Sequence, residues 1–439
     1  MQSIFGRGEG MKKLRTIFCA AAFSGLVCHG GLLDFRILSF ERSGTLTWAN
    51  APVPGVCTVE VAAFLAGPWR PLKSFFATNP FGFATVTPIA SPGFYRLFAA
   101  SIPATAQGFS NLCASYSTLR TIAGKGDIGI DGFNAWEAQF EGGWATDAEL
   151  SRPHMAMGDD AGNVYIADKD AHAIRKVTPA GRIFTAAGMN EPGDDGDSAG
   201  PATRRHLVSP NGLWVRGDGT FYILDMGNGK VRKVSPGGVM TTLFKVSGGI
   251  DDGRGLWVSE DETLAYVASG ASVKRWTPNG GLKTYESGFK ELGNIAVDSA
   301  GRLVVTDRAD HRVYRISNNG NKSVIAGNGE LTGGGDGELA KDTALPGVRG
   351  IWFFPTGGYF LATHEGSQIW YVDTSGIIHL FVDGQRQAHD GDGDYFRSPG
   401  FKVSEVRAIT MDREGNLLIT ENDVGFIRKI DFLRRLGGN

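Results

Sequence analysis

The sequence repeats itself from about residue 153 to its C-terminal end, and this repeat restricts the fold more than any other feature. Six units align, and they begin near Pro153, Pro210, Gly253, Gly293, Val348 and Val406. Each contains an apolar strand, an Asp/Gly turn, a Val/Ile/Tyr-rich strand that ends in a polar residue, a third strand such as AIRKV (173–177) and an outer strand. Four short strands in about 40 residues is the period of a β-propeller blade, and the period-two alternation excludes a helical solenoid.

The sixth unit stops after its third strand, because the chain ends at Asn439. A spare outer strand, TLRTIAGKG (118–126), precedes the first unit and closely matches SVIAGNG (323–329). Paired with the sixth unit, it would close the ring and remove an exposed sheet edge. The sequence therefore predicts six blades over residues 117–433, followed by a tail at 434–439.

Two segments, GNVYIADKDAHAIRKVTPAG (162–181) and GRLVVTDRADHRVYRISNNG (301–320), resemble NHL repeats, whose core is a strand, "aD", a short turn, "nhrIrk" and a Gly turn. The resemblance covers about residues 117–433 and is strongest in the first, second and fourth units. In the other units the Asp of the motif is replaced by Ser269, His364 and Glu421. The resemblance implies an NHL-type six-bladed β-propeller, a fold that serves both enzymes and binding scaffolds.

Residues 31–100 contain short alternating or apolar runs separated by turn residues, and they predict a small antiparallel β-sandwich. The runs lie at 35–40, 45–49, 56–64, 83–89 and 94–99. Trp48, Trp69 and Tyr95 are expected to fill its core, and residues 101–116 are expected to be a linker. The whole chain is thus predicted to be all-β, with an NHL-type six-bladed β-propeller preceded by a small antiparallel β-sandwich domain.

The N-terminus has the pattern of a signal peptide, which residues 1–30 would form, with Met11 as an alternative start. A short basic stretch precedes an uncharged run from Thr16 to Cys28, which is too short to cross a bilayer, since spanning needs about 20 apolar residues. No other segment approaches that length. We therefore expect no transmembrane segment and an exported protein that is periplasmic, on the cell surface or secreted, and a lipoprotein form through Cys28 stays open.

Four cysteines are present, at positions 19, 28, 57 and 113, and the first two would leave with the signal peptide. Export permits a disulfide between Cys57 and Cys113, and the alternative is two small buried side chains. No Cys-x-x-Cys motif or Cys/His cluster occurs, which argues against a structural zinc site.

Long inserts separate the outer strand of one unit from the first strand of the next, at 191–208, 330–347 and 384–402, and a fourth insert, 127–152, precedes the first unit. In a propeller these connections, the starts of the first strands and the ends of the second strands lie on one face. Long loops on a rigid scaffold are where binding sites concentrate. We therefore expect a ligand on this loop-rich face, at the funnel of the central channel.

The residue before the apolar core of each first strand should lie at the mouth of this channel. By unit, these six residues, the mouth ring, are His154, Asn211, Arg254, Gly293, Arg349 and Arg407. Three arginines without a carboxylate favour a ligand with an anionic group. The alternative is that the arginines pair with carboxylates at the ends of the second strands and only hold the blades together.

Polar residues end the second strands, at Asp168, Asp225, Ser269, Asp307, His364 and Glu421. Aspartates in this pattern suit either a carboxylate ring for a metal or an acid/base pair, or turn capping through backbone N–H groups. Repetition favours capping, because catalysis needs an asymmetric site. The departures His364 and Glu421 are therefore candidate ligand-binding residues, as a His–carboxylate pair, with a structural histidine as the alternative.

The string HDGDGDY (389–395) places Asp390, Asp392 and Asp394 at the spacing that opens many calcium loops. It lacks the Gly after the third Asp, and Phe401 stands where the twelfth loop position needs a carboxylate. Calcium at this loop is the one cofactor considered, and the alternative is a turn-rich surface loop without any cofactor.

The favoured function is a non-enzymatic exported scaffold, expected to be a monomer, that binds a glycan, peptide or protein. The balance of 44 basic and 46 acidic residues argues against nucleic acid as a partner. The alternative is a metal-dependent enzyme, because SPNGLWVRGDGTFYILD (209–225) is similar to a segment of gluconolactonase-like lactonases, which implies Asn211 as a metal ligand. That family's later Asp is not evident at LGN (292–294) or VRG (348–350), and its early Glu-Gly-Pro is missing, so binding is preferred.

Overall fold

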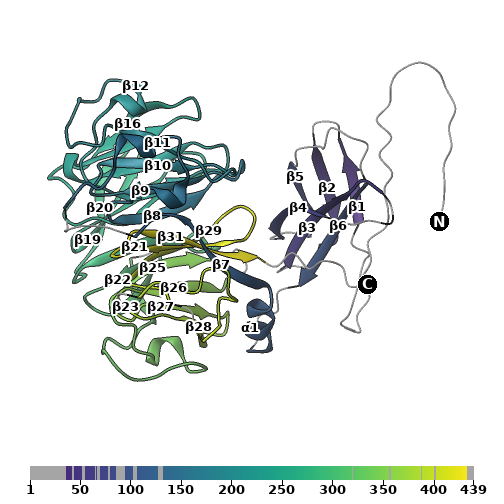
Figure 1. The fold of residues 1–439 in the computed structure, drawn as a ribbon. Coiled ribbons are helices and arrows are strands. Elements are labelled where there is room, and N and C mark those ends of the chain that lie inside the picture. The colour runs from purple at the N-terminus through teal and green to yellow at the C-terminus, as the bar shows by residue number, and fades with distance from the viewer. Residues whose placement is uncertain are drawn as a thin grey trace, which may run out of the picture. The chain divides into compact units, whose positions relative to one another are not determined.

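A computed structural model of the chain describes residues 36–41, 44–51, 55–64, 66, 70–77, 80–85, 94–101, 106–126, 132–318, 320–354, 357–386, 388–399 and 402–432. The fold is all-β, with a single α-helix among these residues (Figure 1). The chain divides into two compact units, Met1–Ser101 with Arg434–Asn439, and Ile102–Leu433. No helix formed by the described residues has the length and apolar character needed to span a bilayer. The predicted signal peptide and C-terminal tail lie outside the described residues.

In the smaller unit, the part of the chain that the structure describes forms two three-stranded antiparallel sheets. One is ordered β1 (Arg36–Phe40), β2 (Thr45–Ala49) and β5 (Gly82–Thr85), and the other β4 (Arg70–Ala77), β3 (Gly55–Ala62) and β6 (Phe94–Ser101). Alternate residues of β2, β3 and β6 are buried in one cluster, which includes Trp48 and Tyr95 as predicted. Trp69 lies outside the described residues, and β4 is a strand that the sequence pattern did not predict.

The described residues of the larger unit form six antiparallel sheets, and in the first five the strands follow one another along the chain. The first consists of β8 (Pro153–Gly158), β9 (Val164–Asp168), β10 (Ala173–Val177) and β11 (Ile183–Gly188). The second consists of β13 (Pro210–Val215), β14 (Phe221–Asp225), β15 (Lys230–Val234) and β16 (Val239–Lys245), with β12 (Gly200–Pro201) at its edge. The third consists of β17 (Leu256–Val258), β18 (Ala265–Ser269), β19 (Ser272–Thr277) and β20 (Gly281–Ser287).

The fourth sheet consists of β21 (Leu292–Val297), β22 (Leu303–Asp307), β23 (Arg312–Ile316) and β24 (Lys322–Ala326). The fifth consists of β25 (Val348–Phe353), β26 (Tyr359–Thr363), β27 (Gln368–Val372) and β28 (Ile378–Asp383). Single turns of 3-10 helix lie in the connections, at Ala138–Phe140, Ala145–Asp147, Ala202–Arg204, Met226–Asn228 and Ala340–Asp342. Short strands with left-handed glycines at their turns account for much of the glycine in the sequence.

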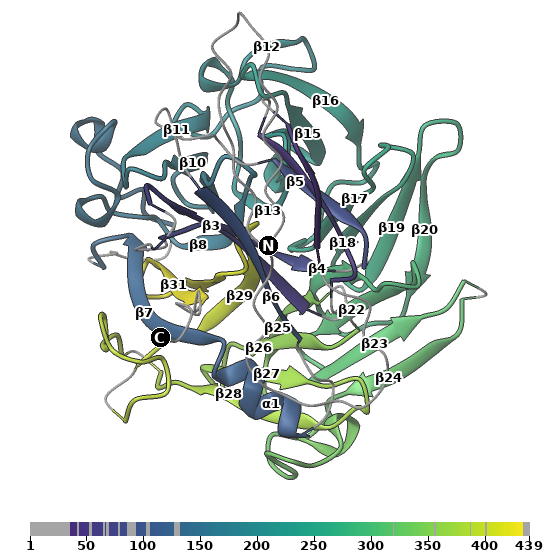
Figure 2. The same ribbon diagram turned by 90° about the vertical axis from the view of Figure 1, so that its right-hand side faces the viewer.

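The sixth sheet joins the two ends of this unit. Its order is β29 (Val406–Met411), β30 (Leu417–Glu421), β31 (Phe426–Phe432) and β7 (Tyr116–Ala123). β7 overlaps the segment predicted to complete the last unit, and it pairs antiparallel with β31, with Leu119 opposite Ile430. Figure 2 shows the blue β7 beside the yellow β31. Since Leu119 is fully buried, this N-terminal strand supplies core packing as well as hydrogen bonds.

The innermost strands of the six sheets contact one another in a cycle. β8 contacts β13, β17, β21, β25 and β29 follow in turn, and β29 contacts β8. A Cβ at Gly350 would lie 2.9 Å from Cβ of Ala362 and 3.1 Å from the backbone N of Ile409, so glycine is needed for this approach of β25 to β29. The core lies between the sheets, and Ala167 and Leu213, from adjacent sheets, belong to one buried cluster.

The segment 101–116, predicted to be a linker, contains the helix α1 (Ala106–Cys113). The ring of Phe109 stacks on His379 of β28, with 4.5 Å between centroids, and Arg397 donates a hydrogen bond to Sγ of Cys113. Residues of the predicted linker thus form a helix that packs against β28. A helix of this length is stabilised by tertiary packing rather than by its own periodicity, so the sequence carries little signal for it.

Cys57 and Cys113 are both free and buried. Cys57 belongs to the core cluster of the smaller unit, and burial raises its pKa to about 12. The structure therefore has the second of the two alternatives, small buried side chains, rather than the disulfide.

Candidate functional site

A register shift at the start of the innermost strands positions the mouth ring. In β8, His154 falls between two paired residues and has no partner on β9. Asn211, Arg349 and Arg407 likewise fall between two paired residues of their strands and have no partner on the next strand. In β21 the shift is wider, and Gly293 lies within it. β-Bulges re-aim a side chain, and here they present one residue of each shifted strand to the channel.

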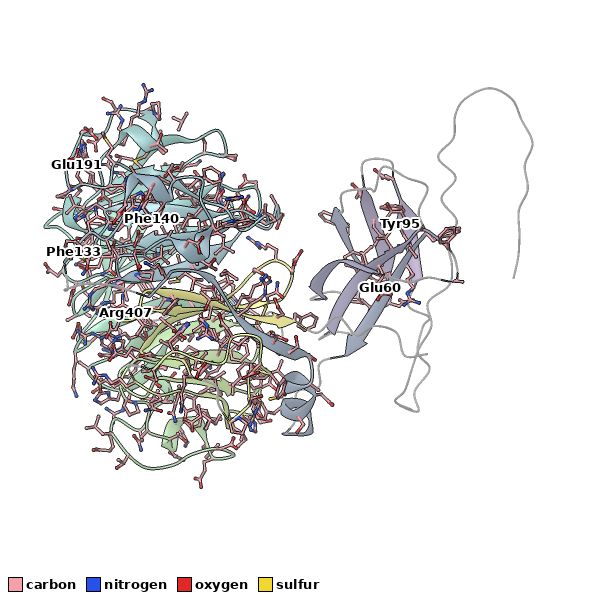
Figure 3. All side chains as sticks on the ribbon, in the orientation of Figure 1. Glu60, Tyr95, Phe133, Phe140, Glu191 and Arg407 are labelled. Carbon is pink, nitrogen blue, oxygen red and sulfur yellow. The ribbon has the colours of Figure 1, made fainter. Side chains whose placement is uncertain are left out.

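The six mouth-ring residues line one small cavity in the larger unit. Its lining consists of His154, Met155, Asn211, Arg254, Gly293, Asn294, Arg349 and Arg407. The volume is about 10 Å³, which is room for about one water molecule. Figure 3 labels Arg407 among the side chains of this unit. The structure thus brings all six predicted positions together, and the space between them admits only the tip of a ligand.

Arg349 is the arginine of the mouth ring that lacks a counter-ion among the described residues. It is 7% exposed, and its Nε and Nη1 atoms are buried without a hydrogen-bond partner. Burial, with the charges of Arg254 and Arg308, lowers the pKa of Arg349 to about 9. A buried cation without a partner is costly, so this side chain is poised for an anion.

Arg254 shares its counter-ions with a neighbour. Its Nη1 lies 3.2 Å from Oε1 of Glu291, which also pairs with Arg308, and its Nη2 lies 3.5 Å from the exposed Asp252. Burial lowers the pKa of both arginines, and the charge of Arg254 contributes to the shift at Arg308. The partly buried carboxylate of Glu291 therefore forms ion pairs with both Arg254 and Arg308.

Arg407 is in a similar position. Its Nη2 lies 3.8 Å from Oδ1 of Asp423, which Arg152 approaches more closely, at 3.2 Å. Burial, followed by the charges of Arg349 and Arg254, lowers the pKa of Arg407 to about 8. The arginines of the mouth ring are thus not paired with the carboxylates that end the second strands, which was the alternative considered from the sequence.

His154 completes the mouth ring as a neutral side chain. Burial, together with the charges of Arg407 and Lys169, holds its pKa well below the ordinary value of 6.5. Its Nδ1 atom is buried without a hydrogen-bond partner. A neutral imidazole offers a hydrogen bond to an anion without adding to the positive charge of the ring.

The aspartates that end the second strands cap turns, and two of the three also bind an arginine of their own sheet. Asp168 accepts hydrogen bonds from a backbone N–H at 2.5 Å and from Nε of Arg175 at 2.9 Å. Asp225 is bound in the same way by a backbone N–H and by Arg232, and Asp307 accepts from three backbone N–H groups. These contacts match the capping alternative and leave no free carboxylate ring.

His364 and Glu421 do not form the predicted pair. In the sixth sheet, Glu421 pairs with Val406, the first residue of the innermost strand. The residue that pairs with the first residue of the innermost strand in the fifth sheet, Val348, is Thr363 and not His364. Glu421 instead binds Nδ1 of His389 at 2.9 Å and Nη1 of Arg428 at 3.2 Å. β26 ends at Thr363, so His364 lies one residue beyond the strand end that the repeat predicts for it.

Glu405 and Asp423 are two carboxylates that the sequence reasoning missed. Nε2 of His364 lies 3.7 Å from Oε2 of Glu405 and 3.8 Å from Oδ2 of Asp423. Glu405 stands two positions before its mouth-ring residue and has a φ of 42°. In four other sheets, the residue two positions before the mouth-ring residue also has a positive φ, in the left-handed region. An acidic residue in this strained position is the signal that could have found it.

The three aspartates of the candidate calcium loop do not converge. Asp392 accepts hydrogen bonds from the backbone N of Thr121 at 3.0 Å and from Nη2 of Arg428 at 2.6 Å. Asp390 and Asp394 do not join it in any group of described side chains whose ligand atoms gather within 4.8 Å. Through Asp392 the loop forms hydrogen bonds with both β7 and β31. Calcium binding at this loop stays a prediction.

Asn211, the metal ligand implied by the lactonase resemblance, has no carboxylate beside it in the cavity. Its Nδ2 donates to Sδ of Met226 at 3.4 Å, and its Oδ1 is buried without a partner. The ionisable side chains that line the same cavity are His154 and three arginines. A metal ion here would face cations and lack anionic ligands, so these residues do not fit a lactonase-type metal centre.

A second cavity adjoins the first and is mostly apolar. It has a volume of about 80 Å³, and Trp214, Trp257 and Trp352 are among its lining residues. The ring centroid of Trp214 lies 6.1 Å from that of Trp257 and 6.3 Å from that of Trp352. Met155 and Asn294 line both cavities, so the channel is cationic in one part and aromatic in the next.

No protein-family model matches the chain. Among curated proteins, the chain is 25% identical over 280 residues to Protein SUPPRESSOR OF QUENCHING 1, chloroplastic, from Arabidopsis thaliana. The match covers 54% of this chain and 26% of that protein, so the chain spans about a quarter of the relative's length.

Solved structures with a similar fold are β-propeller-like proteins. A protein of unknown function from Bacteroides thetaiotaomicron matches with a TM-score of 0.57 and 14% identity, over 92% of this chain and 99% of that chain. An auxiliary nutrient binding protein from Bacteroides ovatus matches with a TM-score of 0.55 and 12% identity, over 88% and 93%. A second auxiliary nutrient binding protein, from Bacteroides thetaiotaomicron, matches with a TM-score of 0.54 and 14% identity, over 91% and 97%. At such identities the likeness is one of fold.

Proposed function

We propose that this chain is an exported, monomeric binding protein with a small β-sandwich and a six-bladed NHL-type β-propeller, and that its ligand enters the channel mouth with an anionic group. The observation that carries the proposal is Arg349, a buried guanidinium with unpartnered Nε and Nη1 atoms in the cavity that Arg254 and Arg407 also line. An anion between the three arginines would form charge-assisted hydrogen bonds and offset their mutual repulsion.

The size of the cavity restricts what enters it. A volume of about 10 Å³ admits about one oxygen atom of a carboxylate or phosphate, and not a sugar ring. His154 and Asn211 add uncharged polar contacts at the same level. The body of the ligand, a glycan, peptide or protein, would then rest on the inserts 191–208, 330–347 and 384–402.

Two observations support binding rather than catalysis, and a third supports export. The mouth ring holds a neutral histidine and arginines, without a carboxylate that could act as its acid/base partner. Two solved proteins of similar fold are named auxiliary nutrient binding proteins. The basic and then apolar N-terminal pattern supports export.

Anion binding is tested by calorimetry and thermal shift on the full chain, with phosphate, glucuronate and an acidic peptide, and with glucose and a neutral peptide as uncharged counterparts. We expect at least one anionic probe to bind and to raise the melting temperature above its uncharged counterpart. Arg349→Gln is expected to fold, because it removes an unpaired buried charge, and to lose this binding. Lys283→Gln, at an exposed position of β20, should retain it. Equal anion binding by Arg349→Gln and the unchanged chain would refute the proposal.

A further inference from the structure

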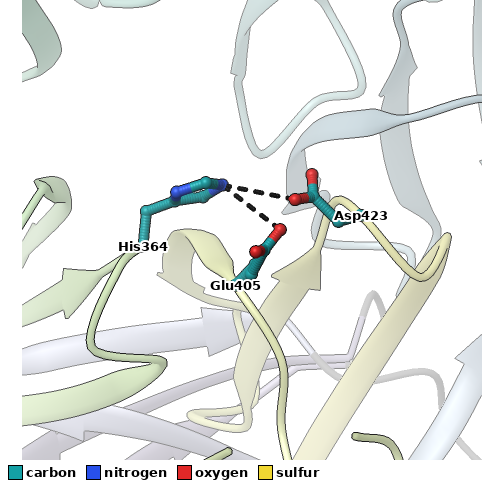
Figure 4. A group of neighbouring side chains, drawn as sticks. All are labelled: His364, Glu405 and Asp423. Atoms are coloured by element: carbon teal, nitrogen blue, oxygen red, sulfur yellow. Dashed lines mark ion pairs between the residues drawn. The ribbon is translucent and has the colours of Figure 1, made fainter. Parts of the chain in front are cut away.

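Three side chains converge next to the mouth ring, and the proposed anion binding uses none of them. His364 directly follows β26, Glu405 directly precedes β29, and Asp423 lies in the turn after β30. Nε2 of His364 is 3.7 Å from Oε2 of Glu405 and 3.8 Å from Oδ2 of Asp423. One ligand atom of each residue lies within 4.8 Å of the other two (Figure 4). Three different connections of the chain therefore deliver one nitrogen and two oxygens to one point.

Each carboxylate uses one oxygen for an arginine and turns the other to His364. Oε1 of Glu405 pairs with Arg386, and Oδ1 of Asp423 pairs with Arg152 at 3.2 Å. Outer contacts of this kind orient the carboxylates of metal sites. The arrangement leaves the two inner oxygens free to act as ligands.

Two of the inner atoms have no hydrogen-bond partner. Nε2 of His364 and Oε2 of Glu405 are both buried and unsatisfied, in residues that are 7% and 1% exposed. Buried polar atoms that face each other without a hydrogen bond destabilise the fold unless a further species binds both.

We propose that His364, Glu405 and Asp423 bind a divalent transition metal ion. One imidazole nitrogen with two carboxylate oxygens suits Zn²⁺ or Mn²⁺, whereas Ca²⁺ and Mg²⁺ prefer oxygen ligands alone. Zinc bonds of about 2.0–2.2 Å can join ligand atoms that are 3.7 and 3.8 Å apart. The two carboxylates offset the charge of the ion, and their outer arginines prevent an excess of negative charge when no ion is bound.

The site is tested by calorimetric titration of the full, chelator-treated chain with Zn²⁺, Mn²⁺ and Ca²⁺. We expect one Zn²⁺ per chain, weaker Mn²⁺ binding and no detectable Ca²⁺ binding. His364→Gln and Asp423→Asn should each weaken Zn²⁺ binding by at least about tenfold. His206→Gln is the matched control, because His206 also lies beside two carboxylates, Asp195 and Glu191, but in an insert, and it should leave the affinity unchanged.

Several results would overturn the metal site: absence of Zn²⁺ binding, Ca²⁺ binding as tight as that of Zn²⁺, or a loss of binding in His206→Gln but not in His364→Gln. The melting temperature of each variant reports its folding. Asp423→Asn, at a partly exposed position, keeps the test decisive if His364→Gln does not fold. Arg349→Gln, which tests anion binding, is expected not to weaken Zn²⁺ binding, so the two proposals can fail separately.

Discussion

Arg175 and Asp168 form an ion pair that solvent does not reach, with Nε of the arginine 2.9 Å from Oδ2 of the aspartate and both side chains 0% exposed. The same seven-residue spacing recurs in two further pairs, Arg232–Asp225 and Arg428–Glu421. In the other three sheets the residue at this spacing is aromatic: Trp276, Tyr314 and Trp370. The arginine therefore occurs only where an acid ends the second strand, because a guanidinium buried alone would destabilise its sheet. The reverse does not hold, since the buried Asp307 has Tyr314 at this spacing and is satisfied by backbone N–H groups instead.

Removal of one partner should show this dependence. Arg175→Met leaves Asp168 buried without its counter-ion, and we expect the free energy of unfolding to fall by about 3–5 kcal/mol. Denaturant unfolding measures the change, and Lys283→Gln, an exposed control, should alter it by less than about 0.5 kcal/mol. The double variant with Asp168→Leu should recover part of the loss. A double variant less stable than Arg175→Met would contradict this account of the pair.

Close packing of the innermost strands should make Gly350 intolerant of a methyl group. Alanine there would place Cβ 2.9 Å from Ala362 and 3.1 Å from the backbone of Ile409, neither of which is a flexible side-chain end. We expect Gly350→Ala to lower the free energy of unfolding by about 1–3 kcal/mol. Gly335→Ala is the control, since no atom lies within 4 Å of its Cβ position. Equal melting temperatures for the two variants would show that β25 and β29 can separate without cost.

The mouth ring could be predicted from the sequence because each member directly precedes an apolar run, and that position repeats with the unit. The pattern identified Arg254, Arg349 and Arg407, and the structure places them around one cavity. Which of them lacks a counter-ion could not be predicted. That depends on Glu291 and Asp423, which lie in connections outside the repeated strands.

Other parts of the structure have weak local signals. In α1 the contact of Phe109 with His379, rather than helical periodicity, stabilises the helix. β4 carries Lys73 and Ser74 within its run, which interrupt the alternation expected of a strand. The metal-site candidates were missed because His364 was aligned one residue out and Glu405 precedes its strand. Spatial convergence of such residues is a tertiary property that no single repeat contains.

The pairing of β7 with β31 should contribute strongly to stability. Leu119 is fully buried in this strand, whereas the neighbouring Arg120 is exposed and pairs with Asp431 at 2.8 Å. We expect Leu119→Ala to lower the free energy of unfolding by about 2–5 kcal/mol, and Arg120→Ala by no more than about 1 kcal/mol. Denaturant titration followed by tryptophan fluorescence measures both. A small effect of Leu119→Ala would mean that the sixth sheet is stable without its outer strand.

His154 should make the protein sensitive to acid. Burial, with the charges of Arg407 and Lys169, holds its pKa in the folded chain well below 6.5, whereas the unfolded chain takes up the proton near that pH. Below about pH 6.5 the unfolded chain binds a proton at this position and the folded chain does not. The free energy of unfolding is therefore highest above about pH 6.5 and decreases as the pH falls below it. Melting temperatures between about pH 7.5 and 5 should fall less for His154→Gln than for the unchanged chain. His206→Gln is the control of opposite sign, because Asp195 raises the pKa of His206, so its stabilisation is present in acid and lost at higher pH. Equal acid sensitivity of His154→Gln and the unchanged chain would mean that His154 already carries its proton in the folded state.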